Sequence, residues 1–330
     1  MNELVSIAIP SYNCGKFIKF TIESLLRQTY SNIEIIVSDN CSTDDSSTIV
    51  SDFCRKDSRV KFFKNETNIG YTKNISSAIE KTNGKYVAIY HADDIYSEKI
   101  IEKQYNVLLN YSEVNHVFTQ LNFLNSEKNI IKNKNYNFLY NFSFEEKAKL
   151  LIGDLNSILP VFLEYGNFLP CPSYMTRKSS LLKNLFDDDF PTNEDLNAWL
   201  KILKNGEKIA FVMEPLLNYR IHEQQGSSAI RKNCDLDVMY KCLDSFISKN
   251  SEINISNKTM EFYKMNKSFS YLRAAMRALD AGNEDLSKLL VTKSKKEYQP
   301  EIYTKLGFAQ NFLKMSYILN KMLKNIKVSL

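Results

Sequence analysis

Two adjacent carboxylates, Asp93 and Asp94, follow an apolar stretch at residues 86–90, and His91 stands just before them. Carboxylates that adjoin a buried segment repel each other unless a cation or solvent relieves their charge. Carboxylate oxygens and a neutral imidazole nitrogen are both ligands for divalent cations. The pair therefore indicates a divalent-metal site, with a solvated turn as the alternative. His91 is either a third ligand or a structural residue at the end of a strand.

Polar residues also follow two other apolar stretches. Pro10 and Tyr12 come after residues 5–9, and Asp39 comes after residues 33–38, where a structural turn is the alternative explanation. The chain contains no glycine-rich phosphate loop of the GxGxxG or GxxxxGK type. A nucleotide bound here would be held without such a loop. A divalent cation that bridges carboxylates to a diphosphate would balance the charge instead.

The elements that carry these residues alternate between two kinds. Apolar, β-branched runs predict strands at residues 5–9, 33–38, 60–63 and 86–90, and helical spacing predicts helices between them. This alternation predicts an α/β fold with a mostly parallel central sheet flanked by helices. Because ligands bind beyond the carboxyl ends of such strands, we expect the three polar groups to meet at one edge of the sheet.

The later part of the chain changes in character. Residues 195–203 predict another helix and residues 209–212 another strand, whereas the Asn-, Lys- and Tyr-rich stretch 126–145 predicts a long loop. After about residue 226 the pattern is helical almost throughout, with breaks near residues 250–257, 282–283 and 300. We therefore expect a catalytic domain at residues 1–225 and a mainly helical C-terminal region at residues 226–330.

Several segments in the right order and spacing resemble the family 2 glycosyltransferases. The segments that carry the resemblance are Val5–Asn13, Ser24–Tyr30, Ile33–Asp44, Asn68–Gly70 with Asn74, Gly84–Asp94, Asn193–Asp195 with Trp199 and Leu200, and Leu217–His222. Together they cover roughly residues 4–225. The resemblance implies a GT-A fold, which is Rossmann-like, and an enzyme that transfers a sugar from a nucleotide diphosphate to a hydroxyl with inversion.

The resemblance also implies how the donor is bound. Asp39 would accept the imide N–H of the base, Pro10 and Tyr12 would line the base pocket, and Asn68 and Lys73 would bind the donor nucleotide. An imide N–H is offered by uracil and thymine, and UDP-sugars are the commoner donors of the family. We therefore favour a UDP-sugar.

The metal and the base follow from the same resemblance. Asp93 and Asp94 would hold Mn²⁺ or Mg²⁺ against the diphosphate, and His222 would contact the metal or the diphosphate. Asp195 would be the general base, with Glu194 beside it. Inversion by a single displacement needs a carboxylate to take the acceptor proton and a cation to stabilise the leaving diphosphate. A turn for His222 and a helix cap for the acidic pair are the structural alternatives.

The sequence departs from the family at one position. The family usually has aspartate where this chain has His91, so that the pattern reads His-Ala-Asp-Asp. This exchange leaves Asp93 and Asp94 as the expected ligands. A nucleotide-sugar-binding module with impaired catalysis is one alternative function, and a sugar nucleotidyltransferase is another, although the latter usually carries a glycine-rich basic loop.

Composition limits the setting. The chain has 330 residues, is 44% hydrophobic and has a net charge of +5. No apolar run reaches the roughly 18 residues that span a bilayer, and the N-terminus lacks a signal-peptide pattern, so we expect a cytoplasmic protein. The six cysteines form no CxxC pair, which argues against a zinc ribbon. The basic excess after residue 226 is too diffuse and too poor in arginine to predict nucleic-acid binding.

The expected acceptor is a saccharide or a lipid-linked saccharide, in the assembly of a bacterial surface polysaccharide such as O-antigen or capsule. An apolar stripe with helical spacing runs through residues 309–328, with lysines among its members. Packing on the protein's own body, a homodimer seam, and peripheral contact with anionic lipid at the inner face of the plasma membrane are three explanations for this stripe.

Overall fold

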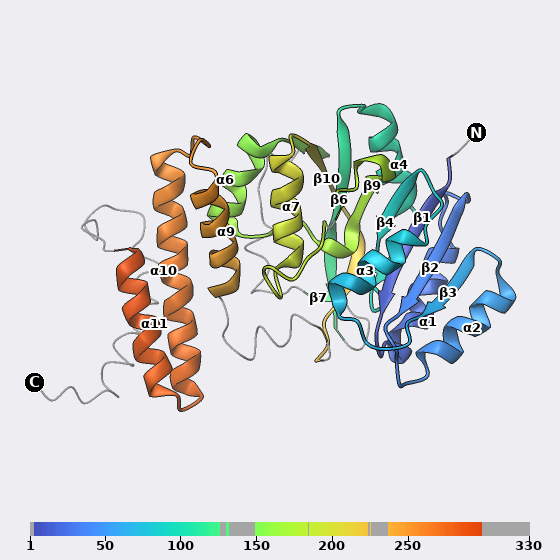
Figure 1. Cartoon of the computed structure of the whole chain (residues 1–330), viewed down its shortest axis with the longest axis horizontal. Coiled ribbons are helices and arrows are strands. Elements are labelled where there is room, and N and C mark those ends of the chain that lie inside the picture. Colours follow the sequence, from blue (N-terminus) through green and yellow to red (C-terminus); the bar gives the residue numbers. More distant parts are fainter. Residues whose placement is uncertain are drawn as a thin grey trace, which may run out of the picture. The chain divides into compact units, whose positions relative to one another are not determined.

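The computed structural model describes residues 3–125, 130–131, 149–183, 185–223, 225 and 237–298 (Figure 1). Two compact units account for them. The first comprises the described residues up to 225 together with 237–254, and the second comprises 255–298. The expected functional division at residues 225 and 226 stays a prediction.

The first unit is built on one mixed sheet with the strand order β3-β2-β1-β4-β9-β6-β10-β5. Its first four strands pair in parallel, as predicted. They are β1 (Val5–Ser11), β2 (Ile33–Asp39), β3 (Val60–Lys64) and β4 (Tyr86–Ile89). The α/β prediction is confirmed, and the predicted strands match these elements to within a residue or two.

The other half of the sheet mixes directions. Strand β9 (Tyr174–Arg177) lies antiparallel between β4 and β6 (Val114–Leu124), and β6 pairs in parallel with β10 (Lys208–Arg220). Three short strands pair antiparallel with β6 or β10. They are β5 (Ile95–Tyr96), β7 (Ile130–Ile131) and β8 (Leu150–Gly153). The sequence pattern did not predict the inserted strand β9, because its residues (Tyr-Met-Thr-Arg) form no apolar, β-branched run like that of the equally short β4.

The helices of the first unit connect these strands. They are α1 (Gly15–Leu26), α2 (Ser46–Lys56), α3 (Tyr71–Glu80), α4 (Ile100–Asn110), α6 (Leu155–Tyr165), α7 (Glu194–Lys204) and α9 (Asp237–Lys249), with two 3-10 turns, η1 (Cys171–Ser173) and η2 (Lys178–Ser180). Helices α6, α7 and α9 lie side by side (Figure 1).

Alternate residues of β1 face two different layers. Ile7 and Ile9 pack in the main core with Ile18 and Ile22 of α1, whereas Ala8 packs on the opposite face with α3. Helices therefore cover both faces of the parallel strands, which explains why those strands read as continuous apolar runs in the sequence. Their polar residues are left to the strand ends, where the candidate site lies.

The second unit contains α10 (Asn257–Asp280) and α11 (Glu284–Glu297), which pack side by side through small and apolar side chains (Figure 1). The turn between them contains Gly282 with φ 78°, a conformation that favours glycine. The predicted helical character and the break near residues 282–283 are confirmed. No helix in the described ranges is long and apolar enough to cross a membrane. The stripe at residues 309–328, and nearly all of the predicted loop at 126–145, lie outside the described residues.

Candidate functional site

The carboxyl ends of β1, β2 and β4 bring the predicted polar groups to one edge of the sheet. Ser11 and Asp39 are paired in register at the ends of β1 and β2, and the Tyr90 N–H after β4 bonds to the Ala8 carbonyl. The segments that follow these strands therefore start from neighbouring points. This is the edge at which parallel α/β sheets bind ligands.

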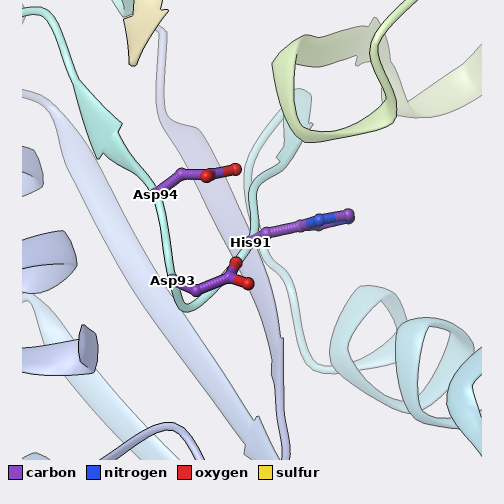
Figure 2. Close-up of side chains that lie close together, drawn as sticks. All are labelled: His91, Asp93 and Asp94. Atoms are coloured by element: carbon purple, nitrogen blue, oxygen red, sulfur yellow. The ribbon is translucent and has the colours of Figure 1, made fainter. Parts of the chain in front are cut away.

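A cluster of metal-ligating groups lies in the loop after β4. His91, Asp93 and Asp94 each offer one donor atom, and these atoms lie within 4.8 Å of one another. Figure 2 shows the three side chains extending to the same side of the loop. The Thr21 hydroxyl of α1 fixes the loop backbone, because it lies 2.9 Å from the Ala92 carbonyl oxygen and 2.7 Å from that of Asp94.

Arg220, at the end of β10, ties this loop to the other half of the sheet. Its main-chain N–H donates to Asp94 Oδ1 at 2.9 Å, and its Nε donates to the Asp93 carbonyl at 2.9 Å. Its guanidinium also lies 5.2 Å from the ring centre of Phe17. The residue is only 2% exposed. Sequence reasoning assigned Arg220 no role, although it stands two residues before His222 in a motif that carried the resemblance.

The two carboxylates of the cluster are in different electrostatic states. Burial raises the pKa of Asp94 well above its usual range, and the neighbouring charge of Asp93 adds to the effect. Burial acts in the same direction on Asp93, but a hydrogen bond from His222 and the proximity of His91 outweigh it, so that the pKa of Asp93 is lowered. A cation placed between the two carboxylates would relieve the repulsion between them.

The cluster fits a divalent cation. Asp94 is fully buried, and its Oδ2 has no hydrogen-bond partner within the described part of the chain. A buried carboxylate oxygen in this state has a lone pair available to a cation. Two carboxylates and an imidazole form a donor set that suits Mn²⁺, and the carboxylates alone suit Mg²⁺.

His222 joins the cluster from the segment after β10. Its Nε2 lies 2.9 Å from Asp93 Oδ2, and its ring lies 4.4 Å from the ring of Phe17. The predicted residues His91, Asp93, Asp94 and His222 are thus brought together from two segments more than 120 residues apart in the chain. This proximity fits the expectation that His222 contacts a metal or a diphosphate.

Two predicted donor-binding residues hold turns in this structure. Asp39 is buried, and its carboxylate accepts hydrogen bonds from the main-chain N–H of Ser42 at 3.0 Å and from the Ser42 hydroxyl. Asn68 Oδ1 accepts from the Asn40 side chain at 2.9 Å and from the Gly70 N–H at 3.0 Å. The turn anticipated as an alternative for Asp39 is present, and the remaining lone pairs of its carboxylate can still accept a base N–H.

The other predicted donor-binding residues differ in exposure. Pro10 is buried in β1, whereas Tyr12, just beyond the strand, has 48% of its surface exposed. Lys73 lies exposed on α3, two residues after Tyr71. Tyr12 and Lys73 can therefore reach a ligand, while Pro10 shapes the end of the strand.

Asp195 lies in the first turn of α7, with Glu194 before it. Its Oδ2 accepts from Asn167 Nδ2 at 2.9 Å, and its Oδ1 accepts from the Leu196 N–H at 2.8 Å. Burial raises the pKa of Asp195 to about 6, against the effect of these hydrogen bonds. A carboxylate with a raised pKa and a fixed orientation has the properties of a general base.

Tyr71, the first residue of α3, lies between the metal-ligating cluster and the acidic pair on α7. Its Oη is 3.0 Å from His91 Nε2, and it interacts with Cys171, Asp195 and Glu194. Sequence reasoning missed Tyr71 because nothing in its spacing distinguishes it from an ordinary residue at the start of a helix.

Comparisons with known proteins find relatives of this chain by sequence and by fold. The family description "Glycosyl transferase family 2" matches residues 6–164. The chain is 32% identical over 227 residues to the Escherichia coli enzyme WfaP, named as a UDP-Glc:alpha-D-GlcNAc-diphosphoundecaprenol beta-1,3-glucosyltransferase. That match covers 67% of this chain and 78% of WfaP.

Two solved structures share the fold at lower identity. S. aureus TarS 1–349 in complex with UDP-GlcNAc superposes with a TM-score of 0.57 at 16% identity, covering 92% of this chain and 95% of TarS 1–349. The mannosyltransferase PcManGT from Pyrobaculum calidifontis, in complex with GDP-Man and Mn²⁺, has a TM-score of 0.56 at 14% identity. The match covers 96% of this chain and 80% of the PcManGT chain.

Proposed function

The chain belongs to glycosyltransferase family 2, and from this premise we propose that it transfers a sugar from a UDP-sugar to a hydroxyl of a saccharide or lipid-linked saccharide, with inversion at the anomeric carbon. The donor class is supported by the UDP-Glc in the name of WfaP and by the UDP-GlcNAc bound to TarS. The lipid-linked acceptor is supported by the WfaP name alone.

One observation carries the proposal, namely the cluster of His91, Asp93 and Asp94 with a buried carboxylate oxygen that lacks a partner among the described residues. We propose that Asp93, Asp94 and His91 hold Mn²⁺ or Mg²⁺, with His222 beside them. When bound, the metal would stabilise negative charge on the leaving diphosphate. The Mn²⁺ bound to PcManGT, which has the same fold, supports this choice.

The donor is held by residues at the ends of the parallel strands. Asp39 is proposed to accept the imide N–H of the uracil, with Pro10 and Tyr12 beside the base. Asn68 and Lys73 are the further donor-binding residues, Lys73 offering a positive charge to the diphosphate. The support for this group is positional: Pro10 and Asp39 lie at the carboxyl ends of β1 and β2, Tyr12 follows β1, and Asn68 and Lys73 lie just before and at the start of α3.

Asp195 is proposed as the general base. A pKa of about 6 keeps its carboxylate ionised at neutral pH and places its basicity close to the range that is most effective in catalysis. Asn167 and the Leu196 N–H orient the two oxygens. Glu194 is the neighbouring acid whose charge raises the pKa of Asp195 further.

We propose that the enzyme acts on the cytoplasmic side of the membrane, in the assembly of a bacterial surface polysaccharide. Residues 1–225 would form the catalytic domain. The C-terminal region at 226–330 would provide peripheral membrane contact or a homodimer seam.

The test begins with calorimetry of UDP, TDP and GDP binding to the whole chain, each with Mn²⁺ and with a chelator. We expect Mn²⁺-dependent binding that is tightest for UDP. UDP-sugars are then offered with diphosphoundecaprenol-linked saccharides, and the anomeric configuration of the product is read from its NMR coupling constants. A product that retains the donor's configuration would contradict inversion. Binding without transfer to any acceptor would favour the nucleotide-sugar-binding module.

A further inference from the structure

The position of Tyr71 is set by the end of β2. The buried side chain of Asn40, the residue after β2, donates to Asn68 Oδ1 at 2.9 Å and to the Gly70 carbonyl at 3.1 Å. Its Oδ1 accepts from the Ile69 N–H at 2.9 Å. Gly70 has φ 86°, a conformation that disfavours other residues. The turn before α3 is therefore fixed by specific hydrogen bonds, and Tyr71 begins the helix from a defined point.

From this position the Tyr71 hydroxyl reaches His91. Oη lies 3.0 Å from Nε2, and the two rings meet edge to face with their centres 6.0 Å apart. The backbone of His91 is held separately, since its N–H donates to the Tyr96 hydroxyl at 2.7 Å. Both the main chain and the ring of His91 thus have a defined partner, and the ring of Tyr71 remains 43% exposed.

The contact at Nε2 limits what the imidazole can do. A neutral imidazole has one N–H donor and one lone pair, and a metal needs the lone pair. With Nε2 facing the tyrosine hydroxyl, only Nδ1 is free to face a cation. The tautomer with its proton on Nε2 makes both interactions at once, because Nε2–H donates to Oη while Nδ1 keeps its lone pair.

The tyrosine proton has a candidate acceptor other than His91. The buried Cys171 lies beside the Tyr71 side chain, and a thiol sulfur is a weak acceptor. A hydroxyl that donates to Cys171 presents its lone pairs to His91. The arrangement therefore fits a chain of hydrogen bonds in which His91 donates to Tyr71 and Tyr71 donates to Cys171.

We propose that Tyr71 is a positioning residue for the metal site, which accepts a hydrogen bond from His91 Nε2–H and so makes Nδ1 the metal-ligating atom of the histidine. This inference rests on the proposed metal-dependent function. It explains how a histidine serves at a position where the family usually has aspartate. An imidazole needs a partner to select its tautomer, whereas a carboxylate does not.

The experiment measures Mn²⁺ affinity by calorimetry in the presence of UDP, and the melting temperature without metal. Tyr71→Phe keeps the ring and removes the hydroxyl. We expect about a tenfold loss of Mn²⁺ affinity with an unchanged metal-free melting temperature, since partners of this kind contribute roughly 10–100-fold. Tyr111→Phe is the matched control, because Tyr111 is another partly exposed tyrosine but lies between α4 and the amino end of β6, at the edge of the sheet opposite the cluster; it should bind Mn²⁺ as the wild type does.

Two further comparisons make the result specific. His91→Asn places an amide oxygen near the position of Nδ1 and His91→Gln places one near Nε2, so the Asn variant should keep the higher Mn²⁺ affinity. Tyr71→Phe should have no additional effect in a His91→Ala background, because it acts through His91.

Wild-type affinity in Tyr71→Phe, tighter binding by the Gln variant, or full additivity in the double variant would each overturn the inference while leaving the proposed function intact. A wild-type chain that binds UDP but no Mn²⁺ would overturn both.

Discussion

Two buried carboxylates lie at opposite edges of the parallel half of the sheet and differ in how far their oxygens are hydrogen-bonded. Glu34, near the amino end of β2, is 4% exposed and accepts hydrogen bonds from the Ser6 hydroxyl at 2.6 Å, Lys61 Nζ at 2.7 Å and the Asn83 N–H at 2.6 Å. Asp94, beyond the carboxyl end of β4, is 0% exposed. It accepts the Arg220 N–H, and its Oδ2 has no partner among the described residues.

The pKa values of Glu34 and Asp94 reflect the number of hydrogen-bond donors around each carboxylate. Burial alone would raise the pKa of Glu34, but the hydrogen bonds from Lys61, Ser6 and Asn83 outweigh it and lower this pKa to about 2. At Asp94, burial raises the pKa well above the usual range. At the amino end of the sheet, the chain itself supplies the partners of the buried carboxylate. At the carboxyl end, one buried carboxylate oxygen has no partner among the described residues and is available to a ligand. Substitutions at the amino end should therefore affect stability, and those at the carboxyl end should affect binding and catalysis.

The largest effect is expected at the proposed base. Asp195→Asn should lower the rate of sugar transfer by about 10³-fold, equivalent to about 4 kcal/mol in the barrier, because a general base is lost. Donor affinity measured by calorimetry should stay within about twofold, since the proposed base acts on the acceptor hydroxyl and not on the donor. The exposed Asp189→Asn is the matched control. A wild-type rate in Asp195→Asn, with a comparable loss in Glu194→Gln, would transfer the role to Glu194.

The amino end should show the opposite behaviour. Glu34→Gln should lower the free energy of unfolding by about 3 kcal/mol at pH 7, from the depressed pKa, while Mn²⁺ and UDP affinity remain unchanged. Because the pKa is about 2 in the folded state and about 4.5 when unfolded, the stabilisation is complete above about pH 4.5 and is lost as the pH falls towards 2. Urea unfolding measures both effects, with the partly exposed Asp52→Asn as control. If variant and wild type were equally stable at pH 7, Glu34 would not have the stabilising role that distinguishes it from Asp94.

A matching change at the carboxyl end is Asp94→Asn. We expect Mn²⁺ affinity in the presence of UDP to fall about 100-fold, or about 2.7 kcal/mol, because a ligand is lost. The melting temperature in chelator should stay equal or rise, since the substitution removes a buried carboxylate that is only partly satisfied. A large fall in this melting temperature would instead give Asp94 the structural role that Glu34 has.

The smallest expected effect is on the pH dependence of kcat/KM for sugar transfer. With a pKa of about 6 for Asp195, kcat/KM for transfer should fall about tenfold per unit as the pH drops below 6, because the base becomes protonated. Asn167→Ala should move the inflection to higher pH, since the Asn167 hydrogen bond lowers this pKa. A profile that stays flat down to pH 5 in wild type would argue against Asp195 as the base.

Much of the architecture was predictable from residue patterns. Strands β1 to β4 and helices α1 to α3 were anticipated because strands buried on both faces must be apolar throughout, and amphipathic helices repeat at 3.6 residues. Strand β9 was not anticipated, because its residues form no apolar, β-branched run like that of the equally short β4. Its antiparallel place between β4 and β6 depends on pairing with distant segments.

The sequence by itself determined which chemical groups are available, since polar residues that follow apolar strands lie at the edge of the sheet where ligands bind. Only the tertiary structure decided which of them meet. Arg220 contacts Asp93 and Asp94 across more than 120 residues, and Tyr71 contacts His91 because a turn fixed by Asn40 starts its helix there. These contacts depend on how strand ends and turns pack together, and such packing is set by the whole sheet rather than by local sequence.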